Sequence, residues 1–169
     1  MRIKSNLAIE DNDPRYSYTT PASGCRFSPG LEIVDKSLSD YLKETAIGLL
    51  REQALLSLEE VFKECSKGNW DNYGAKPISY KAYAEAKRLI EWLPSSFPMP
   101  EIIPEPTGEI ALEWRKDRQF VFIISVGGNN IITYAGMFGK DNKIHGTEFF
   151  VDASPTVIIR CIQRLYKDL

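Results

Sequence analysis

The sequence is poor in the residues that most often carry out chemistry in proteins. Its 169 residues include one histidine and three cysteines. A Ser/His/Asp or Cys/His system would have to use that histidine, His145, and the chain has no Gly-x-Ser-x-Gly nucleophile motif. Neither the short His/Cys spacing of a zinc site nor the oxygen-ligand series of a calcium loop occurs. We therefore expect no catalytic residue, no metal, no other cofactor and no enzymatic activity.

The sequence also lacks long apolar runs and an excess of either charge. No run approaches the 18 apolar residues of a membrane-spanning helix, and the opening MRIKSNLAIEDNDP lacks the apolar stretch of a signal peptide. The 21 basic and 23 acidic residues give a net charge of -2, without the basic excess of a dedicated nucleic-acid binder. Three cysteines far apart suit reduced thiols, so we expect a cytoplasmic protein.

Two further patterns that could indicate chemistry have simpler explanations. Gly127 and Gly128 lie between two predicted strands rather than before a helix, so they indicate a hairpin and not a phosphate-binding loop. Glu109 and Glu113 fall on one face of a predicted strand, about 13 Å apart. That separation is too large for two carboxylates that share a proton.

Proline and glycine divide the chain into two regions. They interrupt residues 1–36 at short intervals, which predicts an extended N-terminal arm, whereas residues 37–169 form a single domain. The arm is rich in apolar residues, so we expect parts of it to dock on the domain or on a partner. Its candidate contact residues are Tyr16, Tyr18 and Phe27.

Two helices are predicted before the strands. Residues 37–67 are rich in Leu, Glu, Ala and Lys, and a continuous helix there would be about 46 Å long. Such a helix either breaks near Gly48, or its first half projects and packs on something else. A second helix is predicted over residues 80–93, with Ser79 as its N-cap.

From residue 109 onward the pattern becomes that of strands: apolar and polar residues alternate over 109–115, and residues 119–126 are apolar on both faces, as in a central strand. Hairpin-length connections require antiparallel pairing, and a last helix follows from the N-cap candidate Ser154. The sequence therefore predicts an α+β two-layer sandwich: an antiparallel meander of four or five strands, with two helices before it and one after. The predicted strands cover residues 102–103, 109–115, 119–126, 131–138 and 144–151.

One face of the predicted sheet should remain free of helices. It carries Val121 and Ile123 of the central strand, and it is more apolar than a face that is fully solvated. We expect the arm or another protein to cover it.

The loop between the two predicted helices is the most distinctive segment. It contains Trp70, Asp71 and Tyr73 beside Gly74. These residues could form a recognition site. They could equally be structural, with Trp70 filling the core and Asp71 accepting backbone N–H groups in an Asx turn.

This loop, Trp70–Ile78, and the segment Gly108–Trp114 together resemble a group of small uncharacterised bacterial proteins. Members share a W-D-x-Y/G-G-A-x-P-I loop and a G-x-I-x-L-E-W strand. The resemblance covers roughly residues 65 to 150. It implies an accessory protein of mobile or defence-related loci and transfers no catalytic residue.

The sequence thus favours a protein-binding module, an accessory subunit or regulator of antitoxin, immunity or anti-phage-defence type. Its partner would be another protein, either a different chain or a second copy, and neither a membrane nor nucleic acid. Leu38 and Tyr41, early in the long helix, join the candidate contact residues. Two alternatives remain: a single-stranded nucleic-acid binder that uses the sheet face, and an unrecognised hydrolase or nuclease that uses carboxylates and His145.

Overall fold

The computed structural model describes residues 29–150 and 156–166. The chain divides into two compact units, Met1–Ser37 and Leu38–Leu169. No helix in the described ranges has the length and apolar character needed to cross a bilayer. The elements, in chain order, are α1 (Pro29–Cys65), α2 (Tyr80–Trp92), β1 (Glu101–Pro104), β2 (Ile110–Arg115), β3 (Phe120–Val126), β4 (Ile131–Phe138), β5 (Lys143–Phe149) and α3 (Thr156–Leu165).

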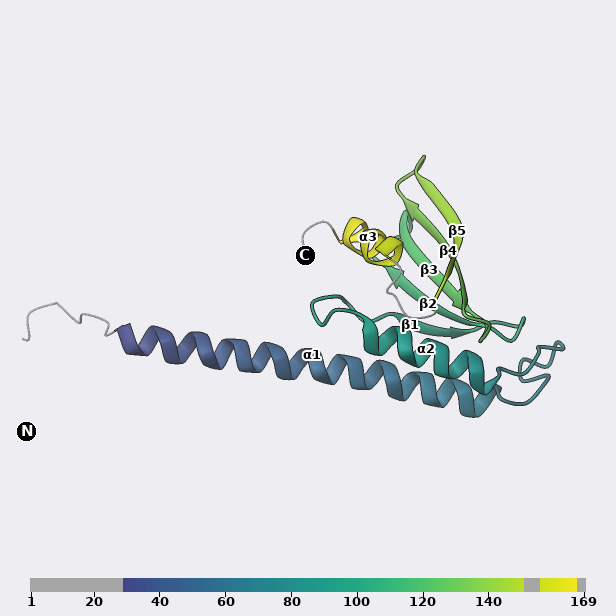
Figure 1. Ribbon diagram of the computed structural model, residues 1–169, viewed down its shortest axis with the longest axis horizontal. Helices are drawn as coiled ribbons and strands as arrows, with labels where there is room; N and C mark the ends of the chain where they lie inside the picture. Colours follow the sequence, from purple (N-terminus) through teal and green to yellow (C-terminus); the bar gives the residue numbers. More distant parts are fainter. Residues whose placement is uncertain (1–28, 151–155, 167–169) are drawn as a thin grey trace, which may run out of the picture. The chain divides into compact units, whose positions relative to one another are not determined.

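The predicted fold class is confirmed. The five strands form one sheet in the order β1-β2-β3-β4-β5, and every neighbouring pair is antiparallel. Two helices precede this meander and one follows it (Figure 1). The short connections dictate this topology, because a tight turn can join only antiparallel neighbours. The predicted N-cap of the last helix, Ser154, lies outside the described residues.

The long helix α1 is continuous and passes through Gly48 without a break. It begins at Pro29, within the segment predicted to be extended, although the boundary between the two units falls after Ser37. Proline suits the first helical position because its missing N–H would have no intrahelical partner there. From Leu31 to Lys36 no further proline or glycine opposes a helix, so the helix extends upstream of the predicted start.

The core lies between the sheet and the helices. α2 packs on β2 and β3, and α3 packs on β3 and β4, so both helices cover the same face (Figure 1). Ser79 caps α2 as predicted, because its hydroxyl oxygen accepts a 3.1 Å hydrogen bond from the N–H of Ala82. The alternation predicted for the strand at 109–115 is not seen in the burial of β2, because Ala111 and Glu113 of its outer face are buried as well. The fully buried side chains on the helix-covered face are Ile110, Leu112, Trp114, Phe122, Ile124, Val126 and Ile132.

From Arg51 onward, α1 packs along α2 in the opposite direction, whereas every described side chain from Leu38 to Leu50 is exposed. Near one end of this contact, the rings of Phe62 and Tyr83 lie 4.8 Å apart. Near the other end, Nη2 of Arg51 donates a 2.7 Å hydrogen bond to the carbonyl of Leu93. α1 therefore reaches the core through α2, and only one of its sides is involved.

The β3–β4 hairpin is fastened to α2 by a buried carboxylate. Oε2 of Glu85 accepts a 2.6 Å hydrogen bond from the N–H of Gly128, whose φ is +83°. The hairpin approaches α2 so closely that a Cβ on Gly128 would lie 2.6 Å from the backbone nitrogen of Ala82. Glycine is therefore required here both by its φ angle and by lack of space.

We predict that Gly128→Ala lowers the free energy of unfolding by about 3 kcal/mol, because it combines left-handed strain with a backbone clash. Gly139→Ala is the matched control. Its φ is +100°, but no atom lies within 4 Å of the added Cβ, so strain alone should cost about 1 kcal/mol. Urea unfolding of both variants measures the difference. Equal losses of stability would show that the hairpin does not press on α2.

Candidate interaction surfaces

The Trp70 loop is held together by its own polar groups. Oδ1 of Asp71 accepts hydrogen bonds from the N–H groups of Tyr73, at 2.8 Å, and Ala75, at 3.0 Å. Nε1 of Trp70 donates to the carbonyl of Lys76 at 3.1 Å, and its half-buried ring packs against the core. These contacts match the structural alternative, in which Trp70 packs on the core and Asp71 accepts backbone N–H groups in an Asx turn. They leave neither the Asp71 oxygen Oδ1 nor the Trp70 indole N–H free for a ligand.

Tyr73 is the part of this loop that remains available. Its side chain is 93% exposed. One exposed tyrosine beside a rigid turn can contribute to a binding surface, but it does not define one.

A stripe of leucines runs along the exposed side of α1. Four leucines fall within about 40° of one another at 3.6 residues per turn. Each is between 54% and 58% exposed. The stripe, named here the leucine stripe, consists of Leu38, Leu42, Leu49 and Leu56. Tyr41, a sequence candidate like Leu38, lies beside it and is also exposed.

The leucine stripe faces away from the rest of the domain. The residues through which α1 enters the core, Ala54, Leu58 and Cys65, lie about 180° round the helix from it. α2 therefore covers one side of the second half of α1, the stripe continues on the opposite side, and the described side chains from Leu38 to Leu50 are exposed all round the helix. Sequence periodicity alone does not tell which of two apolar sides of a helix is buried.

The second surface is the sheet face that α2 and α3 leave uncovered. It presents two rows of side chains that cross the strands: Arg115, Val121, Met137 and Lys143 in one row, and Glu113, Ile123, Ala135 and His145 in the next. The aliphatic members come from β3 and β4, and the charged or titratable members lie on β2 and β5. Of the predicted contacts, Val121 is 8% exposed and Ile123 is half-buried.

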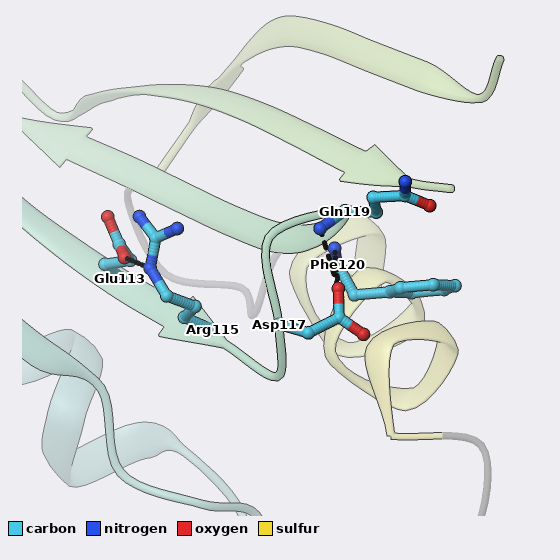
Figure 2. Close-up of polar contacts among 5 residues, drawn as sticks. All are labelled: Glu113, Arg115, Asp117, Gln119 and Phe120. Carbon is cyan, nitrogen blue, oxygen red and sulfur yellow. Dashed lines mark hydrogen bonds and ion pairs between the residues drawn. The ribbon is translucent and has the colours of Figure 1, made fainter. Parts of the chain in front are cut away.

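These rows enclose a basin of about 470 Å³ with an aliphatic floor and a basic rim, named here the basic basin. Nε of Arg115 lies 2.6 Å from Oε1 of Glu113, and Asp117 closes the adjoining turn through the N–H groups of Gln119 and Phe120 (Figure 2). The other rim groups have no hydrogen bond or ion pair within the described residues. They are Arg118, Lys143 and His145.

The floor of the basic basin has no aromatic side chain. Trp114, Phe122 and Phe138 are buried on the opposite, helix-covered face. Phe149 is exposed on the outer face, but it follows His145 by four residues, which is about 13 Å along a strand. The basin can therefore attract anionic groups and cover aliphatic ones, but it offers no ladder of rings for stacked bases.

A separate cavity of about 400 Å³ lies between α2 and the β3–β4 hairpin. Arg88, which lines it, donates to Oδ1 of Asn130 and to the carbonyl of Phe150, and it lies over the Phe150 ring. Glu85 holds Gly128, and its second oxygen is enclosed, so a ligand in the cavity would not reach it. The polar groups here serve to join α2 to the sheet.

The remaining candidates offer no reactive centre within the described ranges. His145 is exposed on β5 opposite Ala135, and no group of three His, Cys, Asp or Glu residues there could hold a metal ion. The arm candidates Tyr16, Tyr18 and Phe27 lie outside the described residues.

We predict that the Asp71 carboxylate stabilises the loop only when it is ionised. The hydrogen bonds from the N–H groups of Tyr73 and Ala75 lower the pKa of Asp71 below its ordinary value of 3.8. Its contribution should therefore be present above pH 3.8 and be lost as the pH falls through the lowered pKa. The difference in unfolding free energy between the wild type and Asp71→Asn, measured by denaturant titration, should shrink below that pH. A constant difference from pH 7 to about pH 2 would contradict this role.

The comparisons with known proteins return no match. No protein-family model matches the chain, and no curated protein or solved structure shows detectable similarity to it. The resemblance to the group with the W-D-x-Y/G-G-A-x-P-I loop therefore stays a prediction. The basis for a functional proposal is the pair of uncovered surfaces: the leucine stripe and the basic basin.

Proposed function

We propose that the chain is a non-enzymatic protein-binding module and that the leucine stripe is its principal docking surface. The observation that carries this proposal is the position of four half-exposed leucines on the side of α1 opposite its packing face. Apolar side chains gathered in this way are typical of an interaction site.

The energetics favour a partner on the stripe. Fully burying one leucine contributes about 1.5–3 kcal/mol, so covering these half-exposed side chains gives about 1 kcal/mol each. Four leucines on one partner supply about 4 kcal/mol, to which the neighbouring Tyr41 adds. Leu42, Leu49 and Leu56 also lie seven residues apart, the spacing at which one helix receives side chains from another element along its length.

The two alternatives have less support. The cationic rim of the basic basin favours nucleic acid, but the absence of aromatic rings on its floor removes the usual stacking contribution. For a hydrolase or nuclease, the candidate base His145 is a solvent-exposed side chain on a sheet edge. We therefore retain protein binding as the proposed function.

We further propose a cytoplasmic location and a regulatory role of the antitoxin, immunity or anti-phage-defence type. Cys65 and Cys161 are free thiols, and burial raises the pKa of both. Buried, protonated thiols are unreactive and suit a reducing compartment. The regulatory role has only the resemblance as its support.

We predict that Leu49→Glu prevents partner binding while Leu50→Glu does not. Leu50 is the matched control because it is 53% exposed but lies about 100° round the helix from Leu49. A charge at position 49 would have to be desolvated beneath the partner, which should weaken binding at least about tenfold. The measurement is quantitative mass spectrometry of proteins that co-purify with each tagged variant from the native host.

The expected result is one or more partners retained by the wild type and by Leu50→Glu but lost from Leu49→Glu. Circular dichroism of each purified variant checks that the fold is intact. The same set of proteins with all three chains would remove the stripe as the docking surface.

A further inference from the structure

The leucine stripe and the basic basin have opposite electrostatic character. Glu52 and Glu59 lie on one side of the stripe, Glu60 follows Leu56 by one turn in line with Leu42, and all three side chains are exposed. Lys63 pairs with Glu59 at 2.8 Å, which leaves Glu52 and Glu60 without an ion pair among the described residues. The stripe is thus aliphatic with an acidic margin, and the basin is aliphatic with a basic rim.

The basin has room for about two turns of the stripe. It takes in residues 121–123 of β3 and 135–137 of β4, about 10 Å along the strands, and Leu49 and Leu56 lie about 10 Å apart along α1. The basin is bounded by β2 and β5, three strand spacings or about 14 Å apart, and a helix with its side chains is about 10–12 Å wide. A helix laid along β3 and β4 would therefore fit between the rim residues of β2 and β5.

We propose that the basic basin of one copy of this chain receives the leucine stripe of α1 from a second copy. In this contact the leucines cover the aliphatic floor formed by Val121, Ile123 and Met137. Glu52 and Glu60 approach Arg118 and Lys143 at the rim. The inference rests on the proposed function, because it takes the leucine stripe to be a protein-binding surface and names its occupant.

This contact joins two different surfaces, so it is heterologous, and every copy carries both halves. A symmetric pairing of two α1 helices would differ from this contact, because it would use the leucine stripe of both copies and leave the basic basin of both copies free. Binding of nucleic acid or an unrelated protein would differ as well, because neither requires a second copy.

Two variants that each lose one half of the contact provide the test. Leu49→Glu blocks the stripe and keeps the basin, whereas Arg118→Glu with Lys143→Glu reverses the rim and keeps the stripe. The matched control for the rim is Lys140→Glu with Arg160→Glu, which makes the same change of net charge at exposed positions outside the basin. Leu50→Glu is the control for the stripe.

We expect wild-type protein to self-associate in sedimentation velocity at low salt, and each blocked variant alone to associate at least about tenfold more weakly. The two blocked variants mixed together should form a 1:1 complex, because one supplies the stripe and the other the basin. Both control variants should behave as wild type. Added salt should weaken the association, since the rim charges are exposed.

Three results would overturn the inference. The first is that wild-type protein stays monomeric at its highest soluble concentration, and the second is that the two blocked variants form no complex when mixed. The third is that Arg118→Glu with Lys143→Glu self-associates as strongly as the wild type. The last result, with Leu49→Glu still disruptive, would indicate symmetric α1 pairing and leave the proposed function standing. A wild-type chain that remains monomeric but retains a host protein sensitive to Leu49→Glu would also overturn only this inference. Leu49→Glu without any effect would overturn both.

Discussion

The packing of the sheet against helices on one face only is the constraint on which the other features depend. α2 and α3 both cover the face that presents Trp114 and Phe122. An antiparallel sheet can leave its second face in water when that face is polar. Here the central strands place Val121, Ile123 and Met137 on the face opposite α2 and α3, so the fold produces an aliphatic surface on which none of the described helices packs.

Like the sheet, the helix α1 is packed against its own domain on one side only. This helix packs on α2, with Phe62 against Tyr83, and its Ala54 and Leu58 belong to the core. Among the described residues nothing covers its opposite side, yet that side carries leucines rather than the polar residues that a solvated face would favour. A helix that is apolar on two sides is suited to joining its own domain to something else. The acidic margin of one surface and the basic rim of the other are what make them complementary.

Much of the fold could be predicted from the sequence because its signals are local. Alternation marked β2, a run apolar on both faces marked β3, Ser79 marked the start of α2, and the hairpin-length turns required an antiparallel meander. The start of α1 was placed too late because Pro14, Pro21 and Gly24 dominate the composition of the first 36 residues, whereas residues 29–36 by themselves suit a helix. The basic basin could not be predicted, since Arg118 and Lys143 meet only through the pairing of strands that are distant in sequence.

The most direct test of the account is the accessibility of α1 inside the native host. Leu49→Cys and Leu50→Cys place thiols at two neighbouring positions of similar exposure, one on the leucine stripe and one off it. Alkylation in intact cells, resolved by site with mass spectrometry, compares each thiol with the same thiol in dilute purified protein. A bound partner predicts that the thiol at position 49 is protected in cells while that at position 50 reacts as freely as in the purified chain. Equal reactivity of both thiols in cells would contradict the claim that the leucine stripe is a docking surface.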